Sequence, residues 1–180
     1  MKIVAFAGMP FSGKSEAVKI AMEQNIPVIR MGDMVWEETK KQGLAINDEN
    51  VGVIANNMRE EYGMDIWAQR TLEKIKTMQE THILVIDGVR NFEEIKFFEG
   101  NLGDNFLLIA VEVSDETRYK RAMNRGREDD SCDIEKIKER DKRELGWGLG
   151  KVIDSADIVI SNECSINEFR KRVQDVFDSF

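Results

Sequence analysis

Eight residues near the start of the chain have the types and spacing of a phosphate-binding loop. The stretch "GMPFSGKS", from Gly8 to Ser15, fits the pattern G-x-x-x-x-G-K-[ST]. Glycines at these positions let backbone N–H groups turn toward an anion, the Lys14 ammonium reaches β- and γ-phosphates, and the Ser15 hydroxyl binds Mg²⁺. A helix that starts at the loop adds the positive end of its dipole. We call residues 8–15 the P-loop and expect it to bind a nucleoside triphosphate.

Asp87 is the acidic residue that we expect to share the metal ion with the P-loop. It ends the apolar run "HILVID", so its carboxylate should emerge at the carboxyl edge of a strand, where ligands bind in open α/β sheets. A helix-capping role without metal is the alternative, because Gly88 follows and turns are common there. The prediction is a Mg²⁺ site made by Ser15 and Asp87.

Short apolar runs that alternate with helical patterns predict the scaffold for these residues. Continuous runs of Val, Ile and Leu are typical of parallel strands buried on both faces, and right-handed crossovers place helices between such strands. We therefore expect an α/β protein with a P-loop NTPase fold, a five-stranded parallel sheet and helices on both faces. The predicted strands are residues 3–7, 27–31, 82–87, 106–113 and 156–162.

The second and third strands are too far apart in sequence for a single crossover helix. Three helical patterns lie between them, at residues 33–42, 48–62 and 65–79. We interpret residues 33–80 as a helical insertion over the sheet edge, within one domain that spans residues 1–180. Near the end of the chain, Ser165 and Glu168 have the spacing of a capping box and predict the start of the last helix.

Composition excludes several classes of protein. The chain has 180 residues, 42% hydrophobic and 33% charged, which is a globular profile. A net charge of −8 argues against nucleic acid as the main partner, although a local basic patch can still bind phosphates. No apolar run approaches the roughly 20 residues of a membrane span. We expect a cytoplasmic protein with small-molecule partners, and the sequence indicates no oligomeric state.

The remaining chemical groups are interpreted as structural. Cys132 and Cys164 are too few for a four-cysteine zinc site and fit a reducing compartment. His82, the single histidine, precedes a predicted strand. The stretch "ELGWGLG", residues 144–150, lacks the strand–helix setting of a dinucleotide loop, and we interpret it as the connection to the last strand.

The sequence resembles nucleoside monophosphate kinases, and adenylate kinases most of all, over nearly its whole length. The matching stretches are "GMPFSGKS", "RMGDMVWEE", "VIDGVR" and "VEVSDETRYKRAMNRGREDD". The set "IDGVR", "GREDD", "RDKREL" and "ADIVISN" is similar to an archaeal group of adenylate-kinase-related P-loop proteins. The resemblance implies a phosphotransferase that uses ATP and Mg²⁺ and acts on a nucleoside monophosphate such as AMP.

The resemblance also implies roles for individual residues. The nucleotide-binding set is Gly8, Met9, Pro10, Phe11, Ser12, Gly13, Lys14, Ser15, Glu16 and Asn162, the last near the donor base. The acceptor-binding set is Gly32, Asp33, Trp36, Arg59, Asp87, Gly88 and Arg90. The catalytic set is Lys14, Arg90, Arg121, Arg125, Arg127 and Arg140. In the resemblance, Arg121 and Arg125 enter a very short lid at residues 125–133, Arg127 leaves it, and Arg140 is a further arginine on the lid side. Arginines suit these positions because a planar guanidinium grips two phosphate oxygens and neutralises the transferring group.

Two features depart from the adenylate kinase pattern. Trp36 stands where adenylate kinases commonly carry an acceptor-phosphate arginine, so Arg59 is a candidate replacement, while Trp36 packs or stacks on a base. The lid is nearly absent, so a short loop must exclude water. That departure predicts slower transfer or more hydrolysis of the nucleotide.

Two alternatives to a nucleoside monophosphate kinase stay open. Dephospho-coenzyme A kinases look similar in the last strand and helix, and they transfer to a ribose hydroxyl, for which Asp33 is a candidate base. The His-Pro pair that this family usually carries is missing from the insertion. The other alternative is an ATP-hydrolysing switch that engages a protein or RNA, because a fold does not fix a function.

Overall fold

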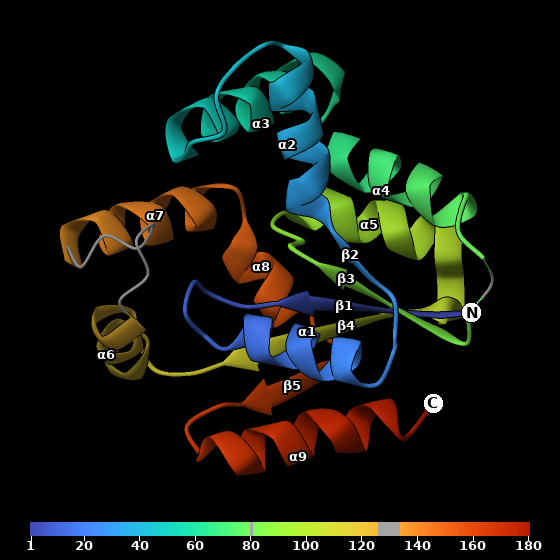
Figure 1. Ribbon diagram of the computed structural model, residues 1–180, viewed down its shortest axis with the longest axis vertical. Helices are drawn as coiled ribbons and strands as arrows, with labels where there is room; N and C mark the ends of the chain where they lie inside the picture. The colour runs from blue at the N-terminus through green and yellow to red at the C-terminus, as the bar shows by residue number, and fades with distance from the viewer. Residues whose placement is uncertain (80, 126–133) are drawn as a thin grey trace.

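The computed structural model describes residues 1–79, 81–125 and 134–180. Within these ranges, five strands form one parallel sheet in the order β2-β3-β1-β4-β5, with helices on both faces (Figure 1). The strands are β1 (Lys2–Ala7), β2 (Val28–Arg30), β3 (Ile83–Asp87), β4 (Phe106–Glu112) and β5 (Ile158–Ser161). The α/β architecture expected from the sequence is confirmed. Strand β2 is shorter than predicted because Met31 already begins a helix.

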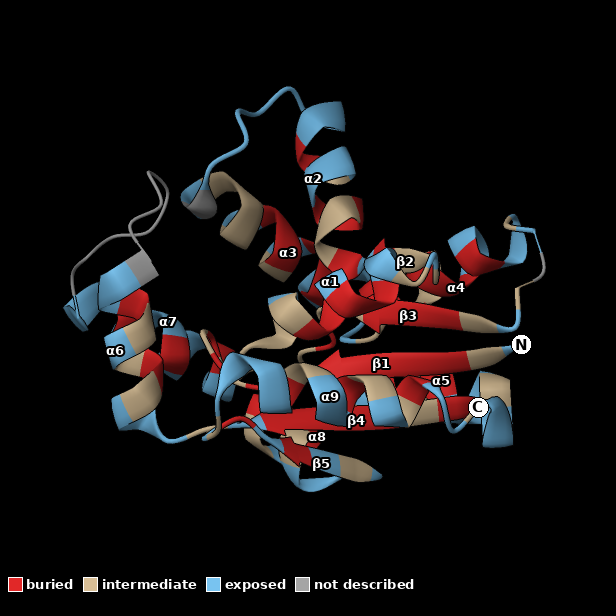
Figure 2. Ribbon diagram, turned by 60° about the horizontal axis from the view of Figure 1, so that its bottom comes forward, coloured by how far each residue is buried: buried red, intermediate tan, exposed pale blue. Residues whose placement is uncertain are grey.

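Strand β1 is enclosed at the centre of the sheet. Its side chains alternate between two cores, with Ile3, Ala5 and Ala7 on one face and Val4 and Phe6 on the other, all at most 1% exposed. It pairs with β3 on one side and β4 on the other (Figure 2). The loop after β1 therefore starts in the middle of the carboxyl edge, where the strand order reverses and ligand crevices form.

Two helical layers cover the sheet. Helices α1 (Lys14–Glu23) and α9 (Ile166–Phe177) pack on one face, and α4 (Ile66–Lys76), α5 (Phe92–Leu102) and α8 (Leu149–Asp154) on the other (Figure 1). Helix α9 begins with the predicted capping box of Ser165 and Glu168. Helix α5 begins with a second capping box, made by Asn91 and Glu94.

The stretch between β2 and β3 forms three helices, as predicted. They are α2 (Met31–Lys41), α3 (Asp48–Tyr62) and α4. Helix α2 begins two residues earlier than expected. The Trp67 Nε1–H on α4 donates to the Ala55 carbonyl on α3 at 3.4 Å, and Trp67 is 1% exposed. This contact fixes α3, at the top of Figure 1, to the layer beneath it.

Helices α6 (Asp115–Arg125) and α7 (Ile134–Gly146) lie beside the P-loop, at the left of Figure 1. From residue 126 on, the predicted lid at residues 125–133 falls outside the described part of the chain, and Arg127 and Cys132 fall there with it. In the described part of the chain, no helix combines the length and the apolar character that crossing a membrane requires.

Residues 144–150 lead through α8 toward β5, and they are more helical than a plain connection. Helix α7 continues to Gly146, and α8 begins at Leu149 after a tight turn at Trp147 and Gly148. The low helix propensity of the glycines is overridden by tertiary packing, because Glu144 and Leu149 are 5% and 1% exposed.

His82 and the end of the chain lie next to each other. The His82 imidazole Nε2 is 2.9 Å from the Phe180 carbonyl oxygen, across 98 residues of sequence. This contact is consistent with a structural role for His82.

The packing of α5 predicts unequal effects for two adjacent phenylalanines. Phe98 is fully buried and its ring stacks on Phe106 with centroids 5.4 Å apart, whereas Phe97 is only partly buried. We expect Phe98→Ala to lower the free energy of unfolding by ~3–5 kcal/mol through the cavity that it leaves. We expect Phe97→Ala to lower it by less than ~2 kcal/mol. Urea denaturation followed by circular dichroism measures both, and equal losses would contradict this packing.

Candidate active site

The P-loop contains two positions that accept only glycine. A Cβ on Gly8 would lie 2.6 Å from the Val111 carbonyl oxygen, and one on Gly13 would lie 2.2 Å from Asn162 Nδ2. The φ angles of the two glycines are 149° and 111°, which side chains rarely permit. The two glycines of the motif are thus required by close contacts with β4 and with the residue after β5.

Lys14 extends back over the loop that precedes it. Its ammonium donates to the Gly8 carbonyl and, at 3.0 Å, to the Met9 carbonyl. Burial lowers the pKa of Lys14 to about 8, although the carboxylates of Glu144 and Asp87 act in the opposite direction. An ammonium held only by carbonyl oxygens can transfer its hydrogen bonds to a phosphate, which is a stronger acceptor.

Ser15 and Asp87 line the same cavity above the P-loop, a space of about 810 Å³. Asp87 ends β3 at the carboxyl edge of the sheet, as predicted. Burial raises the pKa of its carboxyl group, and the positive charges of Lys14 and Arg30 oppose that rise. A hydroxyl and a carboxylate oxygen are donors that suit Mg²⁺, so these residues fit the predicted ion. Whether they hold it stays a prediction.

Asn162 and Arg121 support the P-loop from behind. The Asn162 Nδ2 amide donates to the Ser12 carbonyl at 2.7 Å, and the side chain is 4% exposed. Arg121 donates to the Asn162 carbonyl at 2.8 Å and also lines the P-loop cavity. Asn162 therefore contacts the loop itself, and its predicted contact with a base stays a prediction.

The carboxylate of Glu16 is engaged by another part of the chain. It forms an ion pair with Arg170 of α9, and Arg170 also pairs with Glu23. This pairing ties the start of α1 to α9. The predicted role of Glu16 in nucleotide binding is untested and stays a prediction.

Arg118 joins the P-loop to α6 and α7 and was not predicted from the sequence. It is 1% exposed and donates to the Pro10 carbonyl at 2.9 Å, to both Asp141 oxygens at 3.1 and 2.7 Å, and to Asp115 at 2.5 Å. Its buried charge is therefore compensated on several sides. Its partners lie up to 108 residues away, so no local pattern marks it.

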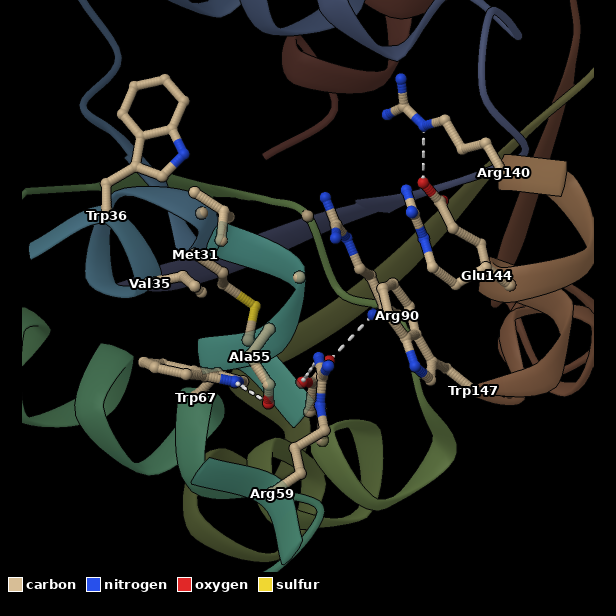
Figure 3. A pocket seen from close by; sticks show the side chains of 16 residues that line it. Met31, Val35, Trp36, Ala55, Arg59, Trp67, Arg90, Arg140, Glu144 and Trp147 are labelled. Atoms are coloured by element: carbon tan, nitrogen blue, oxygen red, sulfur yellow. Dashed lines mark hydrogen bonds and ion pairs between the residues drawn. The ribbon is translucent and has the colours of Figure 1, made fainter. Parts of the chain in front are cut away.

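A second cavity, of about 240 Å³, opens between α2, α3 and the end of α7 (Figure 3). One side of it is apolar, and the other carries charged side chains. The apolar residues are Met31, Val35, Val51, Ala55 and Trp67, and the charged residues are Arg59, Arg90, Glu94, Arg140, Arg143 and Glu144. We call it the arginine cavity.

Trp147 organises the charged side of the arginine cavity. The guanidinium groups of Arg59, Arg90 and Arg143 lie 5.0, 5.6 and 5.7 Å from its ring, which are cation–π distances. Sequence reasoning missed Trp147 and Arg143. The available signal was the helical spacing of Arg140, Arg143 and Trp147, which places Arg140 and Arg143 on one side of α7 and Trp147 in the turn just after it.

Arg59 is buried and only partly satisfied. Its Nη2 pairs with Glu94 at 3.3 Å, but Nε and Nη1 have no hydrogen-bond partner among the residues that the structure describes, and Arg59 is 6% exposed. Glu94 is held in turn by the backbone N–H of Arg90 at 2.8 Å and by the capping box of α5. Unpaired donors at a cavity wall favour an anionic ligand.

Trp36 lies at the rim of both cavities. It is 49% exposed because α2 directs it outward at this position, so of the two roles left open for it, packing accounts for at most half of its surface, and stacking on a base stays a prediction. Asp33 lines the P-loop cavity and not the arginine cavity. The residues that line both cavities are Gly32, Trp36, Gly88, Arg90, Arg140 and Glu144. The side chain of Arg125 is outside the described part of the chain.

Comparisons with known proteins agree with this architecture. A family model described as an AAA domain matches residues 7–138. UPF0200 proteins of Methanosarcina mazei and Methanosarcina acetivorans are each 43% identical to this chain over 180 residues, which is 100% of the chain and 96% of theirs. A UPF0200 protein of Thermococcus onnurineus is 38% identical over 98% of the chain and 96% of its own length.

Solved structures share the fold at low sequence identity. TT1252 from Thermus thermophilus has a TM-score of 0.70 at 18% identity, with 99% of this chain and 97% of that chain covered. Shikimate kinase from Aquifex aeolicus has a TM-score of 0.53 at 17% identity, with 98% and 96% covered. These likenesses show a P-loop kinase-like fold.

The contact between Gly13 and Asn162 predicts contrasting effects for two glycine substitutions. Gly13→Ala places a Cβ against Asn162 at positive φ, so we expect a stability loss of ~1–3 kcal/mol and loss of nucleotide binding. Gly100→Ala is the matched control, because nothing lies within 4 Å of its Cβ on helix α5, and we expect ~0.5–1 kcal/mol of stabilisation. Thermal unfolding with and without ATP measures both. A Gly13→Ala variant that is as stable as the unmodified protein and is stabilised equally by ATP would contradict the contact.

Proposed function

The chain belongs to the UPF0200 family, and from its two adjoining cavities we propose that it is a phosphotransferase that uses ATP and Mg²⁺. The proposed acceptor is a nucleoside monophosphate such as AMP. One observation carries the proposal. Arg90 and Arg140 line both the P-loop cavity and the arginine cavity, so a donor phosphate and an acceptor phosphate would meet between them.

The positive charges at this junction supply what phosphoryl transfer needs. Transfer between phosphates depends on positioning and on neutralising the transferring group, and it needs no general base. Lys14 and Arg121 reach the P-loop cavity, and Arg90 and Arg140 stand at its border with the arginine cavity. Mg²⁺, when bound by Ser15 and Asp87, would add charge on the donor phosphates.

The two sides of the arginine cavity support a nucleoside monophosphate as acceptor. Its apolar side, with Val35, Ala55 and Trp67, suits a flat base. Its cationic side suits a phosphate dianion, because Arg59 has unpaired donors and Arg143 faces the same space. Trp36 at the rim is half exposed and is available to stack on a base.

A hydroxyl acceptor, as in dephospho-coenzyme A kinases, is the second candidate. Such a reaction needs a base, and Asp33 lines the P-loop cavity on the side of α2. The same cationic side chains would then bind an anionic group elsewhere on the acceptor. The two candidates differ in the bond that forms, so product analysis separates them.

The test is a transfer assay with ATP, Mg²⁺ and a panel of acceptors. The panel holds the common nucleoside monophosphates and dephospho-coenzyme A, and products are identified by chromatography. A diphosphate product supports the leading proposal, and phosphorylated coenzyme supports the second. If ATP falls only to ADP and phosphate with every acceptor, the kinase proposal is abandoned in favour of an ATPase or switch.

Lys14 should be essential for turnover. Lys14→Ala removes the ammonium that lies over the P-loop, and we expect kcat to fall about 100-fold or more because a preorganised charge on the phosphates is lost. Lys171→Ala on the exposed surface of α9 is the control and should leave turnover unchanged. Unchanged activity of Lys14→Ala would remove the basis for assigning the P-loop.

Substitution of two arginines should affect the KM values of donor and acceptor separately. Arg143 lines only the arginine cavity and Arg121 only the P-loop cavity. We expect Arg143→Ala to raise KM for the acceptor about tenfold, and Arg121→Ala to raise KM for ATP about tenfold, the effect of one charge-assisted hydrogen bond. Steady-state kinetics with each substrate varied in turn measures the split. A rise in both constants for both variants would contradict two separate subsites.

A further inference from the structure

We propose that the Glu144 carboxylate is an internal substitute for substrate phosphate. In the nucleotide-free protein it neutralises the cations between the two cavities, and a bound phosphate group displaces it from them. Glu144 is thereby a positioning residue that couples donor binding to acceptor binding. The inference rests on the proposed function only in taking the ligands of the two cavities to be phosphates.

The position of Glu144 is the first part of the argument. It lies on α7 with 5% exposure, yet it lines both the P-loop cavity and the arginine cavity. Its Oε1 accepts a hydrogen bond from Arg140 Nε at 3.0 Å (Figure 3). Among the described residues it is the acidic side chain that lines both cavities. An anion is thus built into the border that a transferring phosphoryl group would cross.

The surrounding charges are the second part of the argument. Burial alone would raise the pKa of Glu144, but Arg90, Arg140 and Lys14 outweigh that effect and hold it below the ordinary value. Glu144 is also the carboxylate that most favours the charged form of Lys14, ahead of Asp87. The carboxylate is therefore stabilised by the charges of Lys14, Arg90 and Arg140, and among them Arg140 donates a hydrogen bond to it.

The contrast with Glu94 shows why Glu144 is the displaceable partner. Glu94 accepts hydrogen bonds from two backbone N–H groups and from Arg59, and these bonds fix it in the capping box of α5. Within residues 1–79, 81–125 and 134–180, the polar partner of Glu144 is the single side chain of Arg140, which is itself 45% exposed. A carboxylate held by one side chain can rotate away when a phosphate with more charge competes for the same cations.

Displacement predicts positive coupling between the two ligands. The first phosphate to bind must break the contacts of Glu144, so its measured affinity is lowered by that cost. The second phosphate finds the cations already released, and it binds more tightly than it would alone. Coupling of this kind is reciprocal between the two ligands.

Glu144→Gln tests the proposal, because the amide keeps the shape and the acceptor for Arg140 but removes the charge. The probes are a non-hydrolysable β,γ-imido ATP analogue with Mg²⁺, and inorganic phosphate with and without that analogue, measured by calorimetry. We expect Glu144→Gln to bind each probe alone at least about fivefold more tightly than the unmodified protein. We also expect the analogue to tighten phosphate binding in the unmodified protein and to do so less in the variant.

Glu38→Gln is the matched control. Glu38 is a largely buried carboxylate that pairs with Arg70 at 2.7 Å, and it lines neither cavity. It should lose stability without any gain in anion affinity. If Glu144 had only a structural role, Glu144→Gln would behave like Glu38→Gln and would also show no gain in anion affinity. Anion binding by Glu144→Gln that is equal to or weaker than that of the unmodified protein therefore overturns the proposal.

A second measurement uses the unmodified protein and covers the case in which Glu144→Gln does not fold. A crystal structure with the ATP analogue and Mg²⁺ should show the Glu144 carboxylate rotated away from Arg140 Nε, its hydrogen-bond donor. If it keeps that hydrogen bond, the proposal fails. These readouts need no turnover, so they are separate from the transfer assay. Absence of any phosphate acceptor would defeat the proposed function and leave the binding result standing.

Discussion

Concentrated positive charge is the constraint on which the rest of this structure depends. A lysine and several arginines gather at the carboxyl edge of the sheet, where like charges repel and burial removes their hydration. Three of the arginines are compensated by carboxylates of α5 and α7. Glu94 of α5 pairs with Arg59, Asp141 of α7 with Arg118, and Glu144 with Arg140. Some of the acidic residues behind the net charge of −8, such as Glu94 and Glu144, thus compensate the arginines that line the arginine cavity.

The compensation in turn fixes the geometry of the helices around the sheet. The capping box of α5 holds Glu94 in place, and Glu94 sets which nitrogens of Arg59 stay unpaired. The Trp147 ring, just after α7, lies against guanidinium groups that come from three separate segments of the chain. The arginine cavity is therefore a product of long-range packing on a rigid sheet edge. Its chemistry cannot be separated from the positions of α3, α5 and α7.

Local patterns predicted the P-loop side of the site, the family resemblance supplied Arg59, Arg90 and Arg140 of the arginine cavity, and Arg118, Arg143 and Trp147 were missed. The strands were predicted from apolar runs and the P-loop from the spacing of its glycines. Asp87 was predicted because ligands bind at the carboxyl ends of parallel strands. All three patterns extend over short stretches of sequence. Arg118 and Trp147 were missed because their partners are brought close only by the fold. The helical ends of residues 144–150 were not anticipated, because buried neighbours and not a local pattern keep them helical.

Arg118 gives the region around the P-loop a mechanical property. Because one buried guanidinium bonds the Pro10 carbonyl, Asp115 of α6 and Asp141 of α7, the loop and the two helices are joined at a common pivot. Any displacement of the backbone at Pro10 must therefore either break these hydrogen bonds or carry α6 and α7 with it.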